Sequence, residues 1–327
     1  MIEQQKKEKD LSVIIPMYNS EKSIEKVIES IMAQNYLPNF EIIIIDDDSL
    51  DNSVNIVEEM MVHNEFIKLF RQKNLKQSAA RNRGLLHSSG KVICFVDSDD
   101  YLEKNHFEIL VYPLLQNNQL NMIVSGIQKI YPNKKIVENN SLLSSYKNNK
   151  EMISCYLSQS KEMDVGLWNK SYRASLIKKK KLEFQLENFF EDSLFNLNYL
   201  KDLDPKTVSY SNEVTYNLLK NEESTTMKYR PEIYQLGENY IQTVFQITNQ
   251  MSLSKKTLDA FEKRTKLHLV HHAIKYDPHW SAKKQQKILS ISRLNLFDSE
   301  LSTQYLLAVF MAGKVPNIYR SLYLLFY

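Results

Sequence analysis

The segment Phe40-Glu-Ile-Ile-Ile-Ile-Asp-Asp-Asp-Ser-Leu-Asp51 joins a continuous apolar run to a cluster of carboxylates. Such a run predicts a strand that is covered on both faces, as in a parallel sheet between helices. An apolar run followed by polar residues recurs in Leu11-Ser-Val-Ile-Ile-Pro-Met-Tyr-Asn19 and in Val92-Ile-Cys-Phe-Val-Asp-Ser-Asp-Asp100. Apolar residues at helical spacing follow near residues 24–32 and 54–61. This alternation predicts βαβ units and an α/β fold.

The remaining elements follow from the same periodicities. We expect strands at 11–15, 40–45, 67–70, 92–96 and 122–125, with Pro16 ending the first, and helices near 24–32, 54–61, 78–87 and 105–117. The polar stretch 132–150 predicts a loop. From residue 231 onward the spacing is helical almost throughout. A chain of 327 residues exceeds the ~100–200 residues usual for one domain. We therefore expect a body over residues 1–230 and a helical appendage over 231–327.

The composition excludes several protein classes. With 43% hydrophobic and 25% charged residues, the chain is neither disordered nor fibrous. The first ten residues are charged and form no secretory signal, and no apolar run reaches the ~20 residues of a membrane span, so we expect a cytoplasmic protein. The net charge of +3 combines +7 for residues 255–327 with −4 for residues 1–254. The excess positive charge therefore belongs to the C-terminal segment.

Cysteine and histidine give no metal or disulfide framework. Cys94 and Cys155 lie far apart without Cys or His at ligand spacing. Cys94 lies inside an apolar run and is expected to be a buried thiol. His268, His271 and His272 have no acidic or Cys partner at ligand spacing, so we expect them on a helix surface.

Polar clusters at the ends of three predicted strands are candidates for chemistry, because ligands of open α/β sheets lie at the carboxyl ends of the strands. The clusters are Tyr18-Asn19, Asp46 to Asp51, and Asp97 to Asp100. Ordinary turn and cap chemistry could explain any one of them. Two neighbouring carboxylate clusters repel each other, however, unless a cation or ligand lies between them. A divalent metal with a bound phosphate would satisfy this need.

Six stretches together resemble family 2 glycosyltransferases. Four occur in order in the first 110 residues, and two looser ones follow: Ser12-Val-Ile-Ile-Pro-Met-Tyr-Asn19, Ile45-Asp-Asp-Asp-Ser-Leu-Asp51, Ala80-Arg-Asn-Arg-Gly84, Phe95-Val-Asp-Ser-Asp-Asp100, Leu167-Trp-Asn-Lys-Ser-Tyr-Arg173 and Phe190-Glu-Asp-Ser-Leu-Phe195. The resemblance covers about two thirds of the chain. It implies a GT-A fold, a Rossmann-like α/β domain with a donor half over about 11–110 and an acceptor half over about 111–230, and inverting transfer from a nucleoside-diphosphate sugar.

The resemblance also implies roles for residues on the donor side. Pro16 and Tyr18 would border the base, with Tyr18 stacked on uracil. Asp47 would accept a hydrogen bond from the uracil ring. Arg81 would lie near the nucleotide and support its base or phosphates, and the alternative for Arg81 is a salt bridge on a helix surface.

By the same resemblance, the third cluster would hold the donor's sugar and metal. Asp97 would approach the ribose and the metal shell, with Ser98 beside it on the donor side. Asp99 would coordinate the Mn²⁺ or Mg²⁺ that binds the diphosphate. Asp100 could equally be a structural cap. A cation there would stabilise the charge that develops on the leaving nucleoside diphosphate.

Attack on the sugar requires a base for the acceptor's hydroxyl proton. The resemblance points to Asp192, with Glu191 orienting the acceptor or the base. The alternative for Asp192 is an acid at a helix start, where the helix dipole favours negative charge. Trp168 and Lys170 would line the acceptor side, although a buried tryptophan and a surface lysine are the alternatives.

The chain departs from the family pattern at three positions. Asp48 stands where the family usually has Gly, Leu50 replaces the usual Thr, and Gln77 occupies a position that is often Gly. Asp48 would add negative charge near the nucleotide. The sequence does not determine which backbone conformation its loop adopts without the glycine.

The C-terminal run Lys314-Val-Pro-Asn-Ile-Tyr-Arg-Ser-Leu-Tyr-Leu-Leu-Phe-Tyr327 combines basic and large apolar residues. One hypothesis is a helix on an anionic membrane surface, which would place the protein at the inner face of the cell membrane. The other is a terminal helix docked on the body or on a second subunit. Nucleic-acid binding is not expected, because no recognised motif accompanies the charge.

The leading functional hypothesis is a metal-dependent inverting glycosyltransferase that moves a sugar, expected to be a hexose, from a UDP-sugar to a hydroxyl of a glycan, glycoprotein or lipid-linked acceptor of a bacterial surface. A catalytically silent nucleotide-sugar-binding scaffold is the alternative. A nucleotidyltransferase is a weaker one, because it would need a Gly-rich, basic phosphate loop after the first strand, where this chain has Pro16-Met-Tyr-Asn19.

Overall fold

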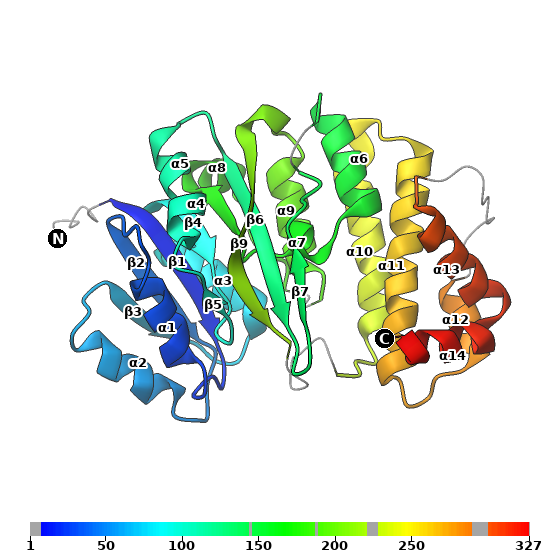
Figure 1. Ribbon diagram of the computed structural model, residues 1–327, viewed down its shortest axis with the longest axis horizontal. Coiled ribbons are helices and arrows are strands. Elements are labelled where there is room, and N and C mark those ends of the chain that lie inside the picture. Colours follow the sequence, from blue (N-terminus) through cyan, green and yellow to red (C-terminus); the bar gives the residue numbers. More distant parts are fainter. Residues whose placement is uncertain (1–7, 144–145, 187–188, 221–227, 290–299, 327) are drawn as a thin grey trace. The chain divides into compact units, whose positions relative to one another are not determined.

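The computed structural model describes residues 8–143, 146–186, 189–220, 228–289 and 300–326 (Figure 1). The chain divides into two compact units, one made of residues 1–149 and 161–221 and the other of residues 150–160 and 222–327. The second unit therefore includes residues 150–160, which the expected boundary near residue 230 had assigned to the body. In the described parts of the chain, no helix is both long and apolar enough to span a membrane.

The described part of the first unit contains one mixed sheet of nine strands in the order β3-β2-β1-β4-β8-β6-β9-β5, with β7 paired to β6 (Figure 1). The strands β3, β2, β1 and β4 run parallel, while β8 is antiparallel to both β4 and β6. Their bounds are β1 Lys9–Met17, β2 Phe40–Asp46, β3 Ile67–Arg71, β4 Gly90–Phe95, β5 Tyr101–Leu102, β6 Met122–Ile130, β7 Lys135–Glu138, β8 Lys170–Arg173 and β9 Val208–Leu219. The sequence prediction of an α/β fold is confirmed.

The continuous isoleucine run of β2 is explained by two covered faces. Ile42 and Ile44 belong to the large core cluster that includes Val27 and Ile28 of helix α1 (Ile24–Met32). Ile43 and Ile45 point to the other face and pack with Ala80 of helix α3 (Lys76–His87). Successive side chains of a strand alternate between faces, so only an apolar residue at every position fills both layers.

The helices of the first unit include the predicted ones and two short helices, α7 (Glu162–Val165) and α8 (Ala174–Lys180), that were not predicted. The others are α1, α2 (Ser53–Met61), α3, α4 (His106–Leu110), α5 (Tyr112–Gln116) and α9 (Glu191–Leu200). The single helix expected over 105–117 is in fact two short helices, α4 and α5, on either side of Val111. The loop expected over 132–150 contains strand β7, which pairs with β6.

The first strand does not end at Pro16, as predicted, but continues to Met17. Pro16 is buried and pairs with Ile45 of β2. Pairing of β1 with β4 has already ended at Ile14 and Phe95, and the Val96 N–H donates to the Ile14 carbonyl at 3.0 Å. A proline is tolerated at this position because its missing N–H would face the side where the ladder has stopped.

The second unit is helical, as predicted for the C-terminal segment. It consists of α6 (Asn149–Gln159), α10 (Ile233–Thr248), α11 (Lys255–Tyr276), α12 (Ala282–Ile288), α13 (Thr303–Lys314) and α14 (Pro316–Phe326). Leu267, Val270 and Ile274 of α11 form a core with Val309 of α13 and Tyr319 of α14.

The prediction that the histidines lie on a helix surface is wrong for two of the three. His272 is buried, and His271 stacks on Tyr323 with ring centroids 4.3 Å apart. His268 is exposed, as expected. The spacing of His271 and His272 does not show which side of α11 packs, and α11 is covered by neighbouring helices over much of its surface.

Candidate active site

The three polar clusters lie at the carboxyl ends of adjacent strands, as the sequence predicted. Tyr18 follows β1, Asp47 follows β2, and Asp97 and Ser98 follow β4, and these strands are neighbours in the sheet. Tyr18 is 47% exposed, which leaves its ring available to a ligand. Ser98 is within 2.7 Å of the Ser20 hydroxyl, so it joins the ends of β4 and β1.

The loop after β2 has the backbone geometry that the family's usual glycine would suit. Asp48 has φ of 72°, in the left-handed region. Aspartate tolerates this conformation better than most residues because its side chain hydrogen-bonds locally. The Asn19 N–H donates to Ser49 Oγ at 2.9 Å, and the Leu50 N–H donates to Asn19 Oδ1 at 2.8 Å. The departure at Asp48 therefore keeps the turn, and the loop is locked to the end of β1.

Asp47 anchors the loop that leads into α3. Its carboxylate accepts hydrogen bonds from the Gln72 side chain and from the backbone N–H groups of Leu75 and Lys76, each at 2.8 Å. Lys76 has φ of 72°, so this loop holds a strained residue beside the carboxylate. A carboxylate offers about four acceptor positions, and these contacts occupy three.

Three residues of the motif Ala80-Arg-Asn-Arg-Gly84 have packing or hydrogen-bonding roles around α3. Ala80 packs under the sheet, and a Cβ on Gly84 would lie 2.3 Å from Ile14 Cγ2, so α3 packs this closely against β1 only with glycine there. Asn82 exchanges two hydrogen bonds with the backbone of Phe184, at 2.7 and 2.8 Å. Asn82 thus fixes the segment that precedes α9, a role that sequence reasoning missed.

Arg81 is the centre of the site. It is 1% exposed, and its guanidinium contacts Asp97 at 2.9 Å, Asp192 at 2.7 Å and Glu191 at 3.7 Å. The ring of Phe184 lies 5.5 Å from the guanidinium carbon. The pKa of Arg81 is raised because these carboxylates outweigh the cost of burial. The alternative of a salt bridge on a helix surface is wrong, since the guanidinium is buried and pairs with carboxylates of α9 and of the turn after β4.

The carboxylates after β4 have separate environments. Oδ1 of Asp97 takes hydrogen bonds from Arg81 and from Gln77 Nε2, at 2.9 and 3.1 Å. Asp99 is partly buried, and burial together with the charge of Asp97 raises its pKa to about 6. Asp100 is buried and accepts hydrogen bonds from the Tyr216 hydroxyl at 2.8 Å and from the Leu219 N–H at 2.7 Å. The structure thus shows Asp100 as a cap that ties β9 to this turn.

Two of these contacts come from residues that sequence reasoning did not assign. The Tyr216 hydroxyl accepts a hydrogen bond from the Asp97 N–H at 3.2 Å as well as donating to Asp100, so β9 shapes the turn that carries Asp97 and Asp99. Gln77 was noted only as a departure from the family's glycine. For Gln77, the signal was a polar side chain close to the carboxylate clusters. For Tyr216 there was no signal, because the strand β9 had no predicted place in the sheet.

Glu191 and Asp192 begin helix α9, as predicted. Burial raises the pKa of both carboxyl groups, and the Arg81 charge opposes that shift in each case. The Arg81 hydrogen bond falls on Oδ1 of Asp192. Among the described residues, no side chain is seen to donate to its Oδ2. Arg81 thus holds one oxygen of the Asp192 carboxylate in place.

The position of α9 is fixed by buried polar contacts to the neighbouring strand and turn. The Tyr172 hydroxyl donates to Asn196 Oδ1 at 2.7 Å, and Asn196 Nδ2 donates to the Val165 carbonyl at 2.7 Å. Both side chains are fully buried. These contacts hold the start of α9, and with it Asp192, against β8 and the end of α7.

Trp168 and Lys170 are both buried. The Trp168 ring stacks on Tyr216 with centroids 5.4 Å apart, so the alternative of a buried tryptophan fits. The alternative of a surface lysine is wrong. Lys170 has no exposed surface and donates to the carbonyls of Met163 and Gly166 at 2.6 Å and to Asn169 Oδ1 at 2.9 Å. Burial lowers the pKa of Lys170 to about 7, and the negative charges of Asp164 and Asp192 oppose that shift.

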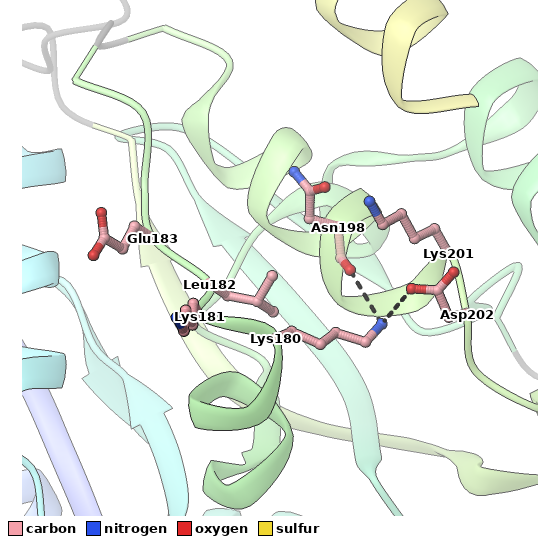
Figure 2. A pocket seen from close by; sticks show the side chains of 7 residues that line it. All are labelled: Lys180, Lys181, Leu182, Glu183, Asn198, Lys201 and Asp202. Atoms are coloured by element: carbon pink, nitrogen blue, oxygen red, sulfur yellow. Dashed lines mark hydrogen bonds and ion pairs between the residues drawn. The ribbon is translucent and has the colours of Figure 1, made fainter. Parts of the chain in front are cut away.

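The open pocket in Figure 2 lies elsewhere in the first unit and contains none of the predicted site residues. Its volume is about 430 Å³, and lysines from the end of α8 and from the residue after α9 dominate its lining. Lys180 is already engaged there, with Asp202 at 3.1 Å and with the carbonyl of Asn198 at 3.3 Å (Figure 2). We assign no ligand to it.

The carboxylate oxygens at the end of β4 are suitable ligands for a hard divalent cation. Mn²⁺ and Mg²⁺ take carboxylate oxygens and share the other positions with phosphate and water. Asp97 and Asp99 provide such oxygens, and the repulsion that raises the pKa of Asp99 would be relieved by a cation. Within the described ranges, no group of three or more His, Cys, Asp or Glu side chains could hold a metal by itself. The diphosphate would have to complete the coordination.

The sequence of this chain matches the model of a known family and several named glycosyltransferases. Residues 12–183 match the family model described as glycosyl transferase family 2. The putative glycosyltransferase EpsH of Bacillus subtilis is 26% identical over 77% of this chain and 73% of EpsH. The UDP-Glc:alpha-D-GlcNAc-diphosphoundecaprenol beta-1,3-glucosyltransferase WfgD of Escherichia coli is 36% identical over 42% of this chain and 50% of WfgD. The chain spans only 27% of the glycosyltransferase GlyA of Streptococcus pneumoniae, at 30% identity over 57% of this chain.

Solved structures show the same fold. TarS 1-349 of S. aureus in complex with UDP-GlcNAc superposes with a TM-score of 0.60 at 18% identity, covering 96% of this chain and 90% of that chain. The mannosyltransferase PcManGT from Pyrobaculum calidifontis, in complex with GDP-Man and Mn²⁺, gives a TM-score of 0.53 at 13% identity, covering 95% of this chain and 88% of that chain. At these identities the likeness shows the fold alone.

Proposed function

Because the chain belongs to glycosyl transferase family 2, with a GT-A fold, and is a glycosyltransferase enzyme, we propose that it transfers a sugar from a UDP-sugar to a hydroxyl group, with inversion at the sugar carbon. The observation that carries this proposal is the buried Arg81, which contacts Asp97 on the donor side and Asp192 on the base side at 2.9 and 2.7 Å. One guanidinium thus holds together the two groups that the reaction requires.

In this proposal the ends of β1, β2 and β4 bind the nucleotide. The exposed ring of Tyr18 stacks on uracil beside Pro16, and Asp47 uses its remaining acceptor position for the uracil ring. Asp97 and Ser98 approach the ribose. The UDP-Glc in the name of WfgD and the UDP-GlcNAc bound to TarS 1-349 support a UDP-sugar as donor.

We further propose that Asp99 and Asp97 hold Mn²⁺ or Mg²⁺. The bound cation would supply positive charge for the leaving diphosphate. The Mn²⁺ in the PcManGT complex supports this proposal, as does the oxygen-rich donor set of this chain. Arg81 would keep Asp97 in position and shield it from Asp192 and Glu191, because it pairs with all three carboxylates.

The proposed base is Asp192. The base must be ionised and must have an oxygen that reaches the acceptor hydroxyl. Arg81 donates to Oδ1 of Asp192 and opposes the rise in its pKa, so it favours the ionised form. Oδ2 would then accept the proton. The adjacent Glu191 would orient Asp192 or the acceptor.

The proposed acceptor is a glycan, glycoprotein or lipid-linked glycan of a bacterial surface. The lipid-linked acceptor in the name of WfgD supports the last of these classes. Trp168 and Lys170 are both buried, so they would not line the acceptor side. They would instead hold the turn between α7 and β8 beneath it.

The experiment measures release of the nucleoside diphosphate, UDP from a panel of UDP-sugars and GDP from GDP-mannose, in the presence of candidate acceptors. The proposal expects release with one or more UDP-sugars and Mn²⁺ or Mg²⁺, and none with GDP-mannose. UDP binding without release from any UDP-sugar would favour the silent nucleotide-sugar-binding scaffold. Absence of nucleotide-sugar binding would overturn the proposal.

A further inference from the structure

The end of the second unit exposes an unusual amount of apolar surface. Of the 17 large apolar side chains that are exposed among the described residues, eight lie between residues 305 and 325. On α14, Ile318, Leu322 and Leu325 are 56%, 40% and 75% exposed. Their spacings of four and three residues place them on one face of the helix. On α13, Leu307 and Phe310 are three residues apart, so they also share one face of their helix, and they are 58% and 37% exposed.

This face of α14 is not the face that anchors the helix. Tyr319 packs into the core of the second unit, and its hydroxyl lies 2.7 Å from Nε2 of His271 on α11. The Arg320 guanidinium lies over the Trp280 ring at 4.6 Å. The helix is therefore docked within its own unit through one side while a second apolar side faces solvent. Scattered single apolar residues need no explanation, but a continuous helical stripe indicates an interaction site.

The charge of the surrounding helices selects the kind of partner. α12, α13 and α14 together contain five Lys or Arg residues and no Asp or Glu. Lys283, Lys287 and Lys314 are exposed. A second copy of the same surface would bring positive charges together, which disfavours self-association. An anionic lipid surface offers the complementary charge and an apolar layer for the exposed stripe.

We propose that α13 and α14, with the lysines of α12, form a docking surface for membranes rich in anionic phospholipids. The lysines would lie among the headgroups, and Ile318, Leu322 and Leu325 would enter the interface beneath them. This proposal concerns the second unit alone and does not depend on the proposed chemistry of the first.

Flotation of the full chain with lipid vesicles tests this proposal. The protein is expected to float with vesicles of phosphatidylcholine mixed with phosphatidylglycerol and not with phosphatidylcholine alone. Raised salt is expected to release it, because salt screens charges at a surface. Failure to float with the anionic vesicles would overturn the proposal.

Substitutions distinguish the apolar from the charged contribution. The variant Ile318→Gln/Leu322→Gln/Leu325→Gln should lose flotation, whereas Val62→Gln, which changes a 74% exposed apolar residue of the first unit, should keep it. The variant Lys283→Gln/Lys287→Gln/Lys314→Gln should bind anionic vesicles about 100-fold more weakly. Lys178→Gln/Lys179→Gln, on the exposed surface of α8, is its matched control and should bind as the unchanged protein does.

Two further measurements separate membrane docking from misfolding and from self-association. The glutamine variants should unfold at the same temperature and bind UDP with the same affinity as the unchanged protein, which would show that the fold and the donor site are intact. Failure of this proposal can then be told apart from failure of the proposed function. Equal flotation of the apolar triple variant and the unchanged protein would overturn the proposal. Sedimentation could instead show a dimer that the apolar substitutions convert to a monomer, with no change in vesicle binding. That result would also overturn the proposal, because the exposed face would then bind a second copy of the chain.

Discussion

Arg81 and Asp192 are 111 residues apart in the sequence, yet Nη1 of the arginine donates a hydrogen bond of 2.7 Å to Oδ1 of the aspartate. The other terminal nitrogen of Arg81 donates to Asp97 at 2.9 Å. The two halves of the site are thus connected through a side chain that is almost completely buried. A planar guanidinium can serve two carboxylates at once, whereas an ammonium group acts as a single point of charge.

Replacement of Arg81 should affect both stability and activity. Arg81→Met would leave three carboxylates without their counter-charge, and loss of a buried ionic partner costs about 3–5 kcal/mol. Denaturant unfolding should show a decrease of this size in the free energy of unfolding. Arg81→Lys should be the milder change for stability but should still lower the rate of transfer, because one ammonium does not reproduce both hydrogen bonds. Arg83→Gln on the same helix is the control, and an equal effect there would contradict the assignment.

Removal of the divalent cation should stop UDP release. With excess chelator the rate should fall to the background level, and Mn²⁺ or Mg²⁺ should restore it. In Asp99→Asn the Mn²⁺ concentration for half-maximal rate should rise by at least about tenfold, because the proposed metal ligand has lost its negative charge. Asp202→Asn changes an exposed carboxylate near the end of α9 and should have no such effect. Undiminished turnover in chelator would show that the reaction needs no metal.

The rate should depend on pH through Asp192. Burial raises its pKa to about 6, and only the ionised form can accept a proton. The value of kcat/KM should therefore fall as the pH drops through about 6, by about tenfold per pH unit at the lower end. UDP affinity measured over the same range separates donor binding from catalysis. A rate that stays constant down to pH 4, with unchanged UDP affinity, would be incompatible with this base.

The sequence predicted the parallel half of the sheet because its strands are continuous apolar runs bounded by polar clusters. The run Ile42 to Ile45 needs two covered faces, and the structure provides them. The strand β9 was not predicted, because the consecutive polar residues Ser211, Asn212 and Glu213 interrupt its alternation and resemble a loop. Its pairing with β6 and β5 depends on contacts that are distant in the sequence.

The individual site residues were predicted from motif positions, but their connections were not. Arg81 lies on a helix whose apolar periodicity is weak, so its burial could not be read from spacing. Its partners Asp97 and Asp192 come from two other elements, and only the packing of α9 against β8 brings them to one guanidinium. The buried state of Lys170 escaped prediction for the same reason, since its three acceptors belong to α7 and to the turn between α7 and β8.

The most direct test of the proposed mechanism compares the unchanged enzyme with Asp192→Asn in one assay of UDP binding and UDP release. The substitution keeps the shape of the side chain and an acceptor for Arg81, but removes the proposed base. We predict that the variant binds UDP with the same affinity and that its rate of sugar transfer falls by about 10²–10⁴-fold. Transfer by Asp192→Asn at the rate of the unchanged enzyme would contradict the mechanism.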